Sequence, residues 1–138
     1  MNVLITGGAG FLGRRLADKL VERGSLKGTD GRDHAIDEIA LLDIVPAEGL
    51  TDARIRMIVG DISDATLLHR AIDRNTAAVF HLAAIVSGQA EADFDLGMRI
   101  NVDASRSLLE ACRACGHQPR VVFTSSVAVY GGDLAATV

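Results

Sequence analysis

MNVLITGGAGFLG, at residues 1–13, runs from a short apolar strand through three spaced glycines into the start of a helix. In such a turn, Gly7 can adopt a positive φ, Gly10 lets the backbone approach a phosphate closely, and Gly13 lets the helix pack against the strand. The first N–H groups of the helix have no intrahelical partner, so they are available to an anion. This stretch therefore predicts a turn that binds a pyrophosphate.

The residues on both sides of the glycines favour this interpretation over a purely structural turn, which remains the alternative. An apolar run precedes the turn, as a buried strand requires. After the turn, leucines recur at helical spacing, which is the context that a dinucleotide-binding motif needs. These residues are Val3, Leu4 and Ile5 before the turn, and Leu12, Leu16 and Leu20 after it.

Length and composition set bounds on the function. The 138 residues suit one domain, with 49% hydrophobic and 23% charged residues. The net charge of −4 does not favour nucleic acid or anionic lipid. The longest apolar run, residues 77–86, is too short to span a bilayer, which takes about 20 residues. No basic leader precedes the first strand, so we expect no signal peptide and a cytoplasmic location.

Strand and helix patterns alternate along the chain. Short apolar runs predict buried parallel strands at residues 3–6, 39–44, 55–59, 78–82 and 121–125. Helical patterns lie at residues 11–23, 64–73 and about 89–115. Ser63 is the expected N-cap of the second helix, and the polar segment 25–37 reads as a surface loop. The alternation predicts an α/β, Rossmann-type doubly wound sheet with strand order 3-2-1-4-5.

The end of the chain suggests a larger protein. After the fifth strand comes a Gly/Ala-rich run with no capping element, which leaves that strand as an open apolar edge. We therefore expect residues 1–138 to form a dinucleotide-binding domain in the N-terminal part of a longer protein. The substrate-binding part is then absent from this chain.

The cysteines and histidines give no reason to expect a redox or metal site. Cys112 and Cys115 form C-x-x-C late in a helical pattern, whereas reactive dithiols lie at exposed helix N-termini. We expect both thiols to be packed in a reducing compartment. The four histidines show no ligand spacing, so no metal is expected.

Acidic residues follow the second and third strands. A carboxylate at Asp43 can accept hydrogen bonds from adenosine ribose hydroxyls and would repel a 2′-phosphate, which favours NAD over NADP. Asp61 lies where the adenine would reach the sheet edge. Both could instead be turn aspartates. After the fourth strand, Ala83 and Ala84 permit close backbone contact with a cofactor, or simply close packing.

Six motifs in order resemble the extended short-chain dehydrogenase/reductases, the NAD-dependent epimerase/dehydratase family. The resemblance covers essentially the whole chain. Within the family, the chain is most similar to members that oxidise a small sugar acid. The motifs are TGGAGFLG at 6–13, Asp43, GDI at 60–62, HLAA at 81–84, NV at 101–102 and TSSVAVYG at 124–131.

The resemblance assigns site roles to individual positions. It implies that Ser126 is the catalytic serine that holds the substrate oxygen and that Asn101 anchors the long helix near the site. Ser87, after the HLAA motif, is a candidate substrate contact or a plain loop serine. The remaining implied NAD contacts are Gly7, Gly10, Phe11, Leu12 and Gly13 at the pyrophosphate, Asp43 at the ribose, Asp61 and Ile62 at the adenine, and Leu82, Ala83 and Ala84 at the nicotinamide half.

The family's acid/base pair is not found in this chain. The resemblance implies a Tyr-x-x-x-Lys motif well beyond the serine, but Tyr130 is the only tyrosine and Leu134 stands four residues later. Lys19 and Lys27, the only lysines, lie near the start. We therefore expect this segment to bind NAD with little turnover.

The sequence thus predicts part of an NAD-dependent oxidoreductase that oxidises a secondary alcohol of a small sugar acid. The alternatives are a nucleotide-sugar epimerase or dehydratase and a non-catalytic NAD-binding module. No nucleic-acid or membrane partner is expected. The long helical pattern resembles the element that pairs family members into homodimers, although its apolar residues could instead cover the sheet: Phe94, Met98, Val102 and Leu109.

Overall fold

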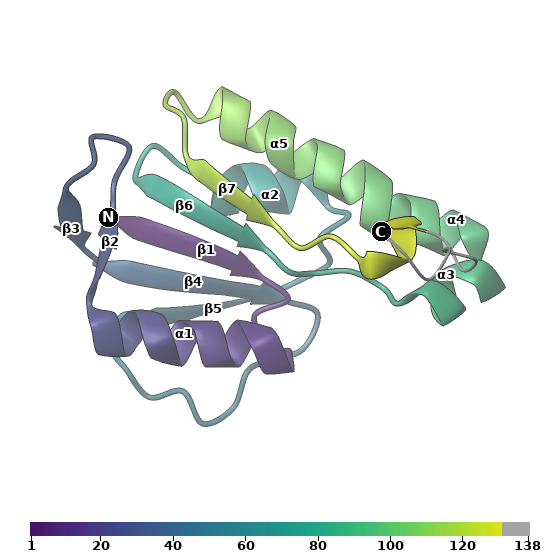
Figure 1. The fold of residues 1–138 in the computed structure, drawn as a ribbon, viewed down its shortest axis with the longest axis horizontal. Coiled ribbons are helices and arrows are strands. Elements are labelled where there is room, and N and C mark those ends of the chain that lie inside the picture. Colours follow the sequence, from purple (N-terminus) through teal and green to yellow (C-terminus); the bar gives the residue numbers. More distant parts are fainter. Residues whose placement is uncertain (131–138) are drawn as a thin grey trace, which may run out of the picture.

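A parallel sheet of five strands lies at the centre of the computed structural model, which describes residues 1–130 (Figure 1). Across the sheet, the strands are β5 (Ile55–Val59), β4 (Glu38–Asp43), β1 (Asn2–Thr6), β6 (Thr76–His81) and β7 (Arg120–Phe123). All four neighbouring pairs are parallel. Counted along the chain, this is the predicted 3-2-1-4-5 order, so the Rossmann-type fold is confirmed.

Helices cover both faces of the sheet. On one face lies α1 (Phe11–Arg23), whose Ala17 and Leu20 pack with the buried Ile5 of β1. On the other face lie α2 (Ala65–Ala71) and α5 (Ala104–Ala114), side by side in Figure 1. Because both faces are covered, β1 and β4 are apolar almost throughout, which made them recognisable in the sequence.

The segment predicted as a plain surface loop contains a small antiparallel hairpin. Its strands are β2 (Ser25–Lys27) and β3 (Asp33–Ala35), paired through Leu26 and His34. β3 is exposed throughout, so it shows no buried face that an alternating pattern could reveal. The prediction of a loop was therefore wrong in detail, although the hairpin does lie at the surface.

The second helix is capped one residue later than predicted. The Asp64 carboxylate, rather than the Ser63 hydroxyl, accepts hydrogen bonds from the backbone N–H groups of Thr66 and Leu67, at 2.9 and 3.2 Å. The backbone N–H of Ser63 in turn donates to Asp61 at 2.8 Å. Two carboxylates thus satisfy the N–H groups around the start of α2.

The long helical pattern is broken into four consecutive pieces. These are α3 (Ser87–Ala92), α4 (Phe94–Gly97), a π-helical segment η1 (Met98–Asp103) and α5. Asp93 separates the first two, with a non-helical backbone and a side chain that accepts from the N–H of Leu96 at 2.9 Å. The break and the π-helical turns redirect this segment along the end of the sheet, where it lies beside the cavity described below.

After β7 the chain makes a short 3₁₀-helix, η2 (Val127–Tyr130). β7 itself ends at Phe123, two residues before the predicted end. Within residues 1–130, no helix has both the length and the apolar character needed to cross a membrane. The two cysteines of α5 and its C-terminus are free thiols, and burial raises the pKa of Cys112 to about 11.

Candidate functional site

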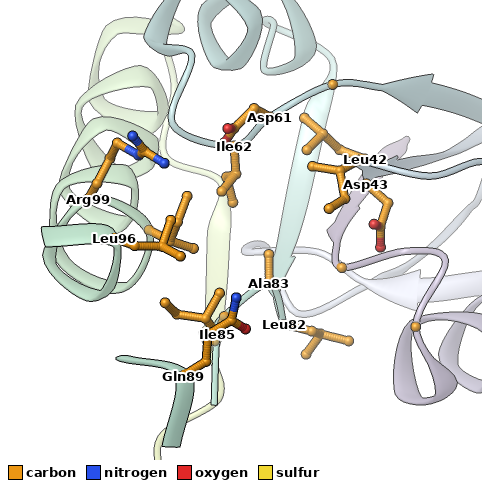
Figure 2. A pocket seen from close by; sticks show the side chains of 16 residues that line it. Leu42, Asp43, Asp61, Ile62, Leu82, Ala83, Ile85, Gln89, Leu96 and Arg99 are labelled. Carbon is orange, nitrogen blue, oxygen red and sulfur yellow. The ribbon is translucent and has the colours of Figure 1, made fainter. Parts of the chain in front are cut away.

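A cavity of about 400 Å³ opens at the carboxyl ends of the strands (Figure 2). It lies where β1 and β6 are neighbours, which is the switch point at which an open α/β sheet binds ligands. Eight of the predicted cofactor-binding residues line it, from four separate parts of the chain. They are Gly7, Gly10, Asp43, Asp61, Ile62, Leu82, Ala83 and Ala84.

The glycine turn forms one wall of the cavity. Gly7 has φ 69°, and a Cβ placed there would lie 2.9 Å from the backbone nitrogen of Ala83. A Cβ on Gly13 would overlap the carbonyl oxygen of Gly7, so this glycine lets α1 pack on the turn itself more than on the strand. A Cβ on Gly10 meets only the Gly7 carbonyl oxygen, at 3.2 Å. Gly7 and Gly13 therefore serve the backbone packing, whereas Gly10 keeps the cavity side open.

The start of α1 is suited to an anion. Gly10 is the N-cap residue, and no side chain caps the helix. The side chains of Phe11 and Leu12 are 76% and 61% exposed, and the Arg15 guanidinium lies 5.8 Å from the centre of the Phe11 ring. The N–H groups of the first helical turn lack intrahelical partners, so they can donate to phosphate oxygens.

Asp43, the last residue of β4, connects this strand to the glycine turn. Its Oδ2 accepts a hydrogen bond from the backbone N–H of Ala9 at 3.0 Å. The N–H of Gly8 donates to the carbonyl of Leu42 at 3.2 Å, which ties the same two segments together. A carboxylate has about four acceptor positions. Asp43 therefore braces the turn and keeps acceptor positions for a ligand.

Asp61 and Arg99 both line the cavity. The hydrogen bond from the Ser63 N–H lowers the pKa of Asp61, and the positive charge of Arg99 lowers it further. Figure 2 shows the Arg99 guanidinium directed toward the side of the cavity where Asp61 lies. This side of the cavity thus presents an ionised carboxylate and a guanidinium to a ligand.

Some residues that line the cavity were not predicted from the sequence. Gln89, from α3, and Leu96 and Arg99, which follow the break at Asp93, also line the cavity, because the chain after β6 follows the end of the sheet. The nearest sequence signal was Asp93 followed three residues later by an apolar residue, which is compatible with a helix cap inside the long pattern.

Asn101 does not line the cavity but holds its wall. From η1, its Oδ1 accepts from the backbone N–H of Ile85 at 3.0 Å, while its Nδ2 donates to the Ile85 carbonyl at 3.1 Å. The side chain thereby pairs with the backbone that follows β6, as a neighbouring strand would. This geometry ties η1 to the segment after β6, and the role that the family resemblance implies for Asn101 stays a prediction.

The two predicted substrate-side serines lie outside the cavity lining. Ser87 begins α3 and is exposed, and Ser126 is an exposed residue three positions after the end of β7. Tyr130 ends η2 and is 70% exposed. Gly131 of the last motif and Leu134 lie outside the described residues. The assignments of Ser87 and Ser126 stay predictions.

Two curated relatives are similar in sequence to this chain over its whole length. D-erythronate dehydrogenase of Cupriavidus necator is 66% identical over 138 residues, and that of Haemophilus influenzae is 42% identical over 139. Both alignments cover 100% of this chain but 42% of the relative. The chain thus spans about two fifths of the length of the curated relatives it matches.

Solved structures share its fold. A nucleoside-diphosphate-sugar epimerase from Agrobacterium tumefaciens is 38% identical, with a TM-score of 0.84 over 98% of this chain and 40% of its own. A mutant uronate dehydrogenase from the same species, complexed with NAD, is 27% identical, with a TM-score of 0.70 over 91% of this chain and 40% of its own. The model of the NAD dependent epimerase/dehydratase family matches residues 3–137. The sequence motifs, the sheet order and this match agree, and the chain belongs to the NAD-dependent epimerase/dehydratase family.

Proposed function

We propose that the cavity binds NAD and that the whole protein oxidises a secondary alcohol of a small sugar acid, as D-erythronate dehydrogenases do. One observation carries the proposal for NAD: residues from the ends of β1, β4, β5 and β6 meet around one cavity beside an uncapped helix start. The substrate class rests on the 66% identity to D-erythronate dehydrogenase of Cupriavidus necator.

We propose that the parts of the dinucleotide bind along the cavity in order. In our proposal the pyrophosphate binds the N–H groups of Phe11 and Leu12, at the helix start that no side chain caps. Asp43 accepts from the ribose hydroxyls with the positions that Ala9 leaves free. The adenine lies beside Asp61 and Ile62. The nicotinamide half lies along Leu82–Ala84, where a side chain on Gly7 would collide with the backbone.

When bound, NAD supplies the hydride acceptor, and the chain's own residues position the substrate. We propose that Ser126 hydrogen-bonds the reacting hydroxyl and that Ser87 contacts another part of the substrate. Both follow strands or turns at the carboxyl end of the sheet, on the side where the cavity opens. General acid/base catalysis needs a further group from outside this chain.

A direct titration tests the cofactor assignment. Isothermal titration calorimetry of the purified chain with NAD is expected to show one site, and NADP to bind more weakly. Absence of any heat or saturable signal with NAD, in a chain whose circular dichroism shows the folded state, would refute the assignment.

A second assay separates the two reaction types with the full-length protein. A dehydrogenase acting on D-erythronate accumulates NADH, which is measured by its absorbance. A nucleotide-sugar epimerase returns the hydride to its substrate and shows no net reduction of NAD. The similarity to the nucleoside-diphosphate-sugar epimerase favours testing UDP-sugars as the alternative substrates.

We also propose that the protein is a cytoplasmic homodimer that pairs through its long helical segment. Large apolar side chains on this segment are 39–70% exposed, so they do not serve to cover the sheet: Phe94, Met98, Val102 and Leu109. An exposed apolar stripe on a helical surface is typical of a partner interface. Sedimentation velocity is expected to show a dimer that Leu109→Glu disrupts and Lys19→Glu, on α1, does not. A monomeric native protein would refute the pairing.

A further inference from the structure

The buried His81, at the end of β6, has no part in the proposed cofactor contacts. Its side chain is almost fully buried, with the residue 2% exposed. Both ring nitrogens have hydrogen-bond partners: Nδ1 lies 2.7 Å from the Thr6 hydroxyl of β1, and Nε2 lies 2.9 Å from the Ser105 hydroxyl of α5. The ring of Phe123, from β7, lies 5.6 Å away between centroids. The imidazole thus links three strands and a helix.

The neighbouring hydrogen bonds fix the direction in which each proton points. The Ser105 hydroxyl donates its single proton to the carbonyl of Asn101 at 2.8 Å, so its oxygen accepts from Nε2–H of His81. Nδ1 of a neutral ring is then an acceptor, and the Thr6 hydroxyl donates to it. The Thr6 oxygen in turn accepts from the backbone N–H of Ala83 at 3.2 Å.

Together with the backbone from Ala83 to Ile85, these hydrogen bonds form a closed loop, which we call the circuit. One end of the chain holds the N–H of Ala83, and the other end reaches Asn101, whose side chain holds both backbone groups of Ile85. The segment Leu82–Ile85, which lines the cavity, is therefore held at two points by the same chain of bonds. Its members, in order, are Ala83, Thr6, His81, Ser105, Asn101 and Ile85.

The circuit works only with a neutral imidazole. A proton on Nδ1 would face the Thr6 oxygen and leave the Thr6 hydroxyl without its acceptor. Burial lowers the pKa of His81 from its ordinary value of 6.5, which favours the neutral ring. Within residues 1–130, the hydrogen-bond and aromatic partners of the ring are Thr6, Ser105 and Phe123, and none of these side chains carries a charge.

We infer that His81 is a positioning residue that holds the cavity wall Leu82–Ile85 in place through Thr6 and Ser105. The consequence for cofactor affinity rests on the proposed NAD site, whereas the consequence for the wall itself does not. Breaking the circuit at Ser105, on α5, is therefore expected to loosen the backbone at Ala83, which Ser105 does not contact.

Amide hydrogen exchange of the ligand-free protein, followed by NMR, tests this inference without any cofactor. In Ser105→Ala, protection at both Ala83 and Ile85 is expected to fall roughly tenfold, the effect of one ordinary hydrogen bond. Ser105→Thr keeps a hydroxyl and is expected to restore most of the protection. Ser107→Ala, on the same helix, is the matched control and is expected to leave both amides unchanged.

Two further measurements complete the test. Nitrogen-15 shifts of the His81 ring are expected to report the Nε2–H tautomer. NAD affinity of Ser105→Ala is expected to fall roughly tenfold, and that of Ser105→Thr to stay near the native value. The inference is overturned if the ring carries its proton on Nδ1, or if Ser105→Ala changes Ala83 no more than Ser107→Ala does. A native protein that binds no NAD would refute the proposed function, while the exchange data would still decide the role of His81.

Discussion

Replacement of Asp43 by alanine separates two roles that the structure gives to one carboxylate. Its Oδ2 accepts from the Ala9 N–H at 3.0 Å, and Oδ1 lies 3.4 Å from the N–H of Val45. The first bond braces the glycine turn whether or not a cofactor is present. The free acceptor positions are those we assign to the ribose hydroxyls. The two roles should therefore appear in different measurements.

The expected magnitudes follow from the number of bonds lost. Losing the brace at Ala9 should reduce the free energy of unfolding by about 1 kcal/mol, since the site is partly open to water. Losing the ribose contacts should weaken NAD binding by about 1–3 kcal/mol, which is about 5-fold to 150-fold in Kd. Asp43→Asn is the matched variant, because its amide oxygen can still accept from Ala9 while the negative charge is removed.

Calorimetric titration with NAD and NADP, together with urea unfolding, distinguishes the outcomes. We expect Asp43→Ala to lose both stability and NAD affinity. Asp43→Asn should keep near-native stability, lose part of its NAD affinity, and discriminate less against NADP, because the charge that repels the 2′-phosphate is gone. If Asp43→Ala unfolds more easily but binds NAD as tightly as the native chain, the ribose assignment is wrong and Asp43 is a structural brace alone.

Five further substitutions test other parts of the reasoning. Gly10→Val should abolish NAD binding in calorimetry with little change in urea unfolding, whereas Gly13→Ala should destabilise the fold itself because its Cβ would overlap the turn. Asp64→Ala should lower the free energy of unfolding by about 0.5–2 kcal/mol by removing the α2 cap, and Ser63→Ala, its control, should change it little. Hydrogen bonds from Arg54 lower the pKa of Asp52 from 3.8 to about 2. The stabilisation that this ionised carboxylate contributes is therefore full above pH 3.8 and is lost as the pH falls toward 2. The native melting temperature should therefore fall more steeply over that range than that of Asp52→Asn, and parallel curves would contradict this.

The order of the sheet was predictable because its signal is repeated. Each parallel strand is buried on both faces, so β1 and β4 carry nearly continuous apolar runs, and right-handed crossovers leave few possible orders. The β2–β3 hairpin carried no such signal because β3 is exposed on both faces. The break at Asp93 was hidden for a different reason: the residues around it continue a helical pattern, and the change to a π-helix leaves no compositional trace.

The site was predictable where the topology alone brings residues together. Asp43 ends a parallel strand and Asp61 and Ala83 each follow one, and the carboxyl ends of parallel strands meet at one edge. Gln89 and Arg99 join them only through the path of the chain after β6, with its break at Asp93, which the sequence did not reveal. The role of His81 was also hidden, because a histidine that ends an apolar run looks the same in sequence whether it binds a ligand or braces the fold.

The contacts around the glycine turn indicate why this site should bind a dinucleotide with little rearrangement. The turn is fixed to β4 through the bond between Ala9 and Asp43, and its Gly7 packs directly against the backbone of Ala83. The hydroxyl of Thr6 then holds the N–H of Ala83, so three strand ends fix one another before any ligand arrives. Ordering a loop on binding would cost free energy, and a wall already held by these bonds avoids that cost. Because the same bonds also stabilise the fold, substitutions at Gly7 or Thr6 should impair folding and binding together, whereas Gly10→Val and Asp43→Asn should separate the two.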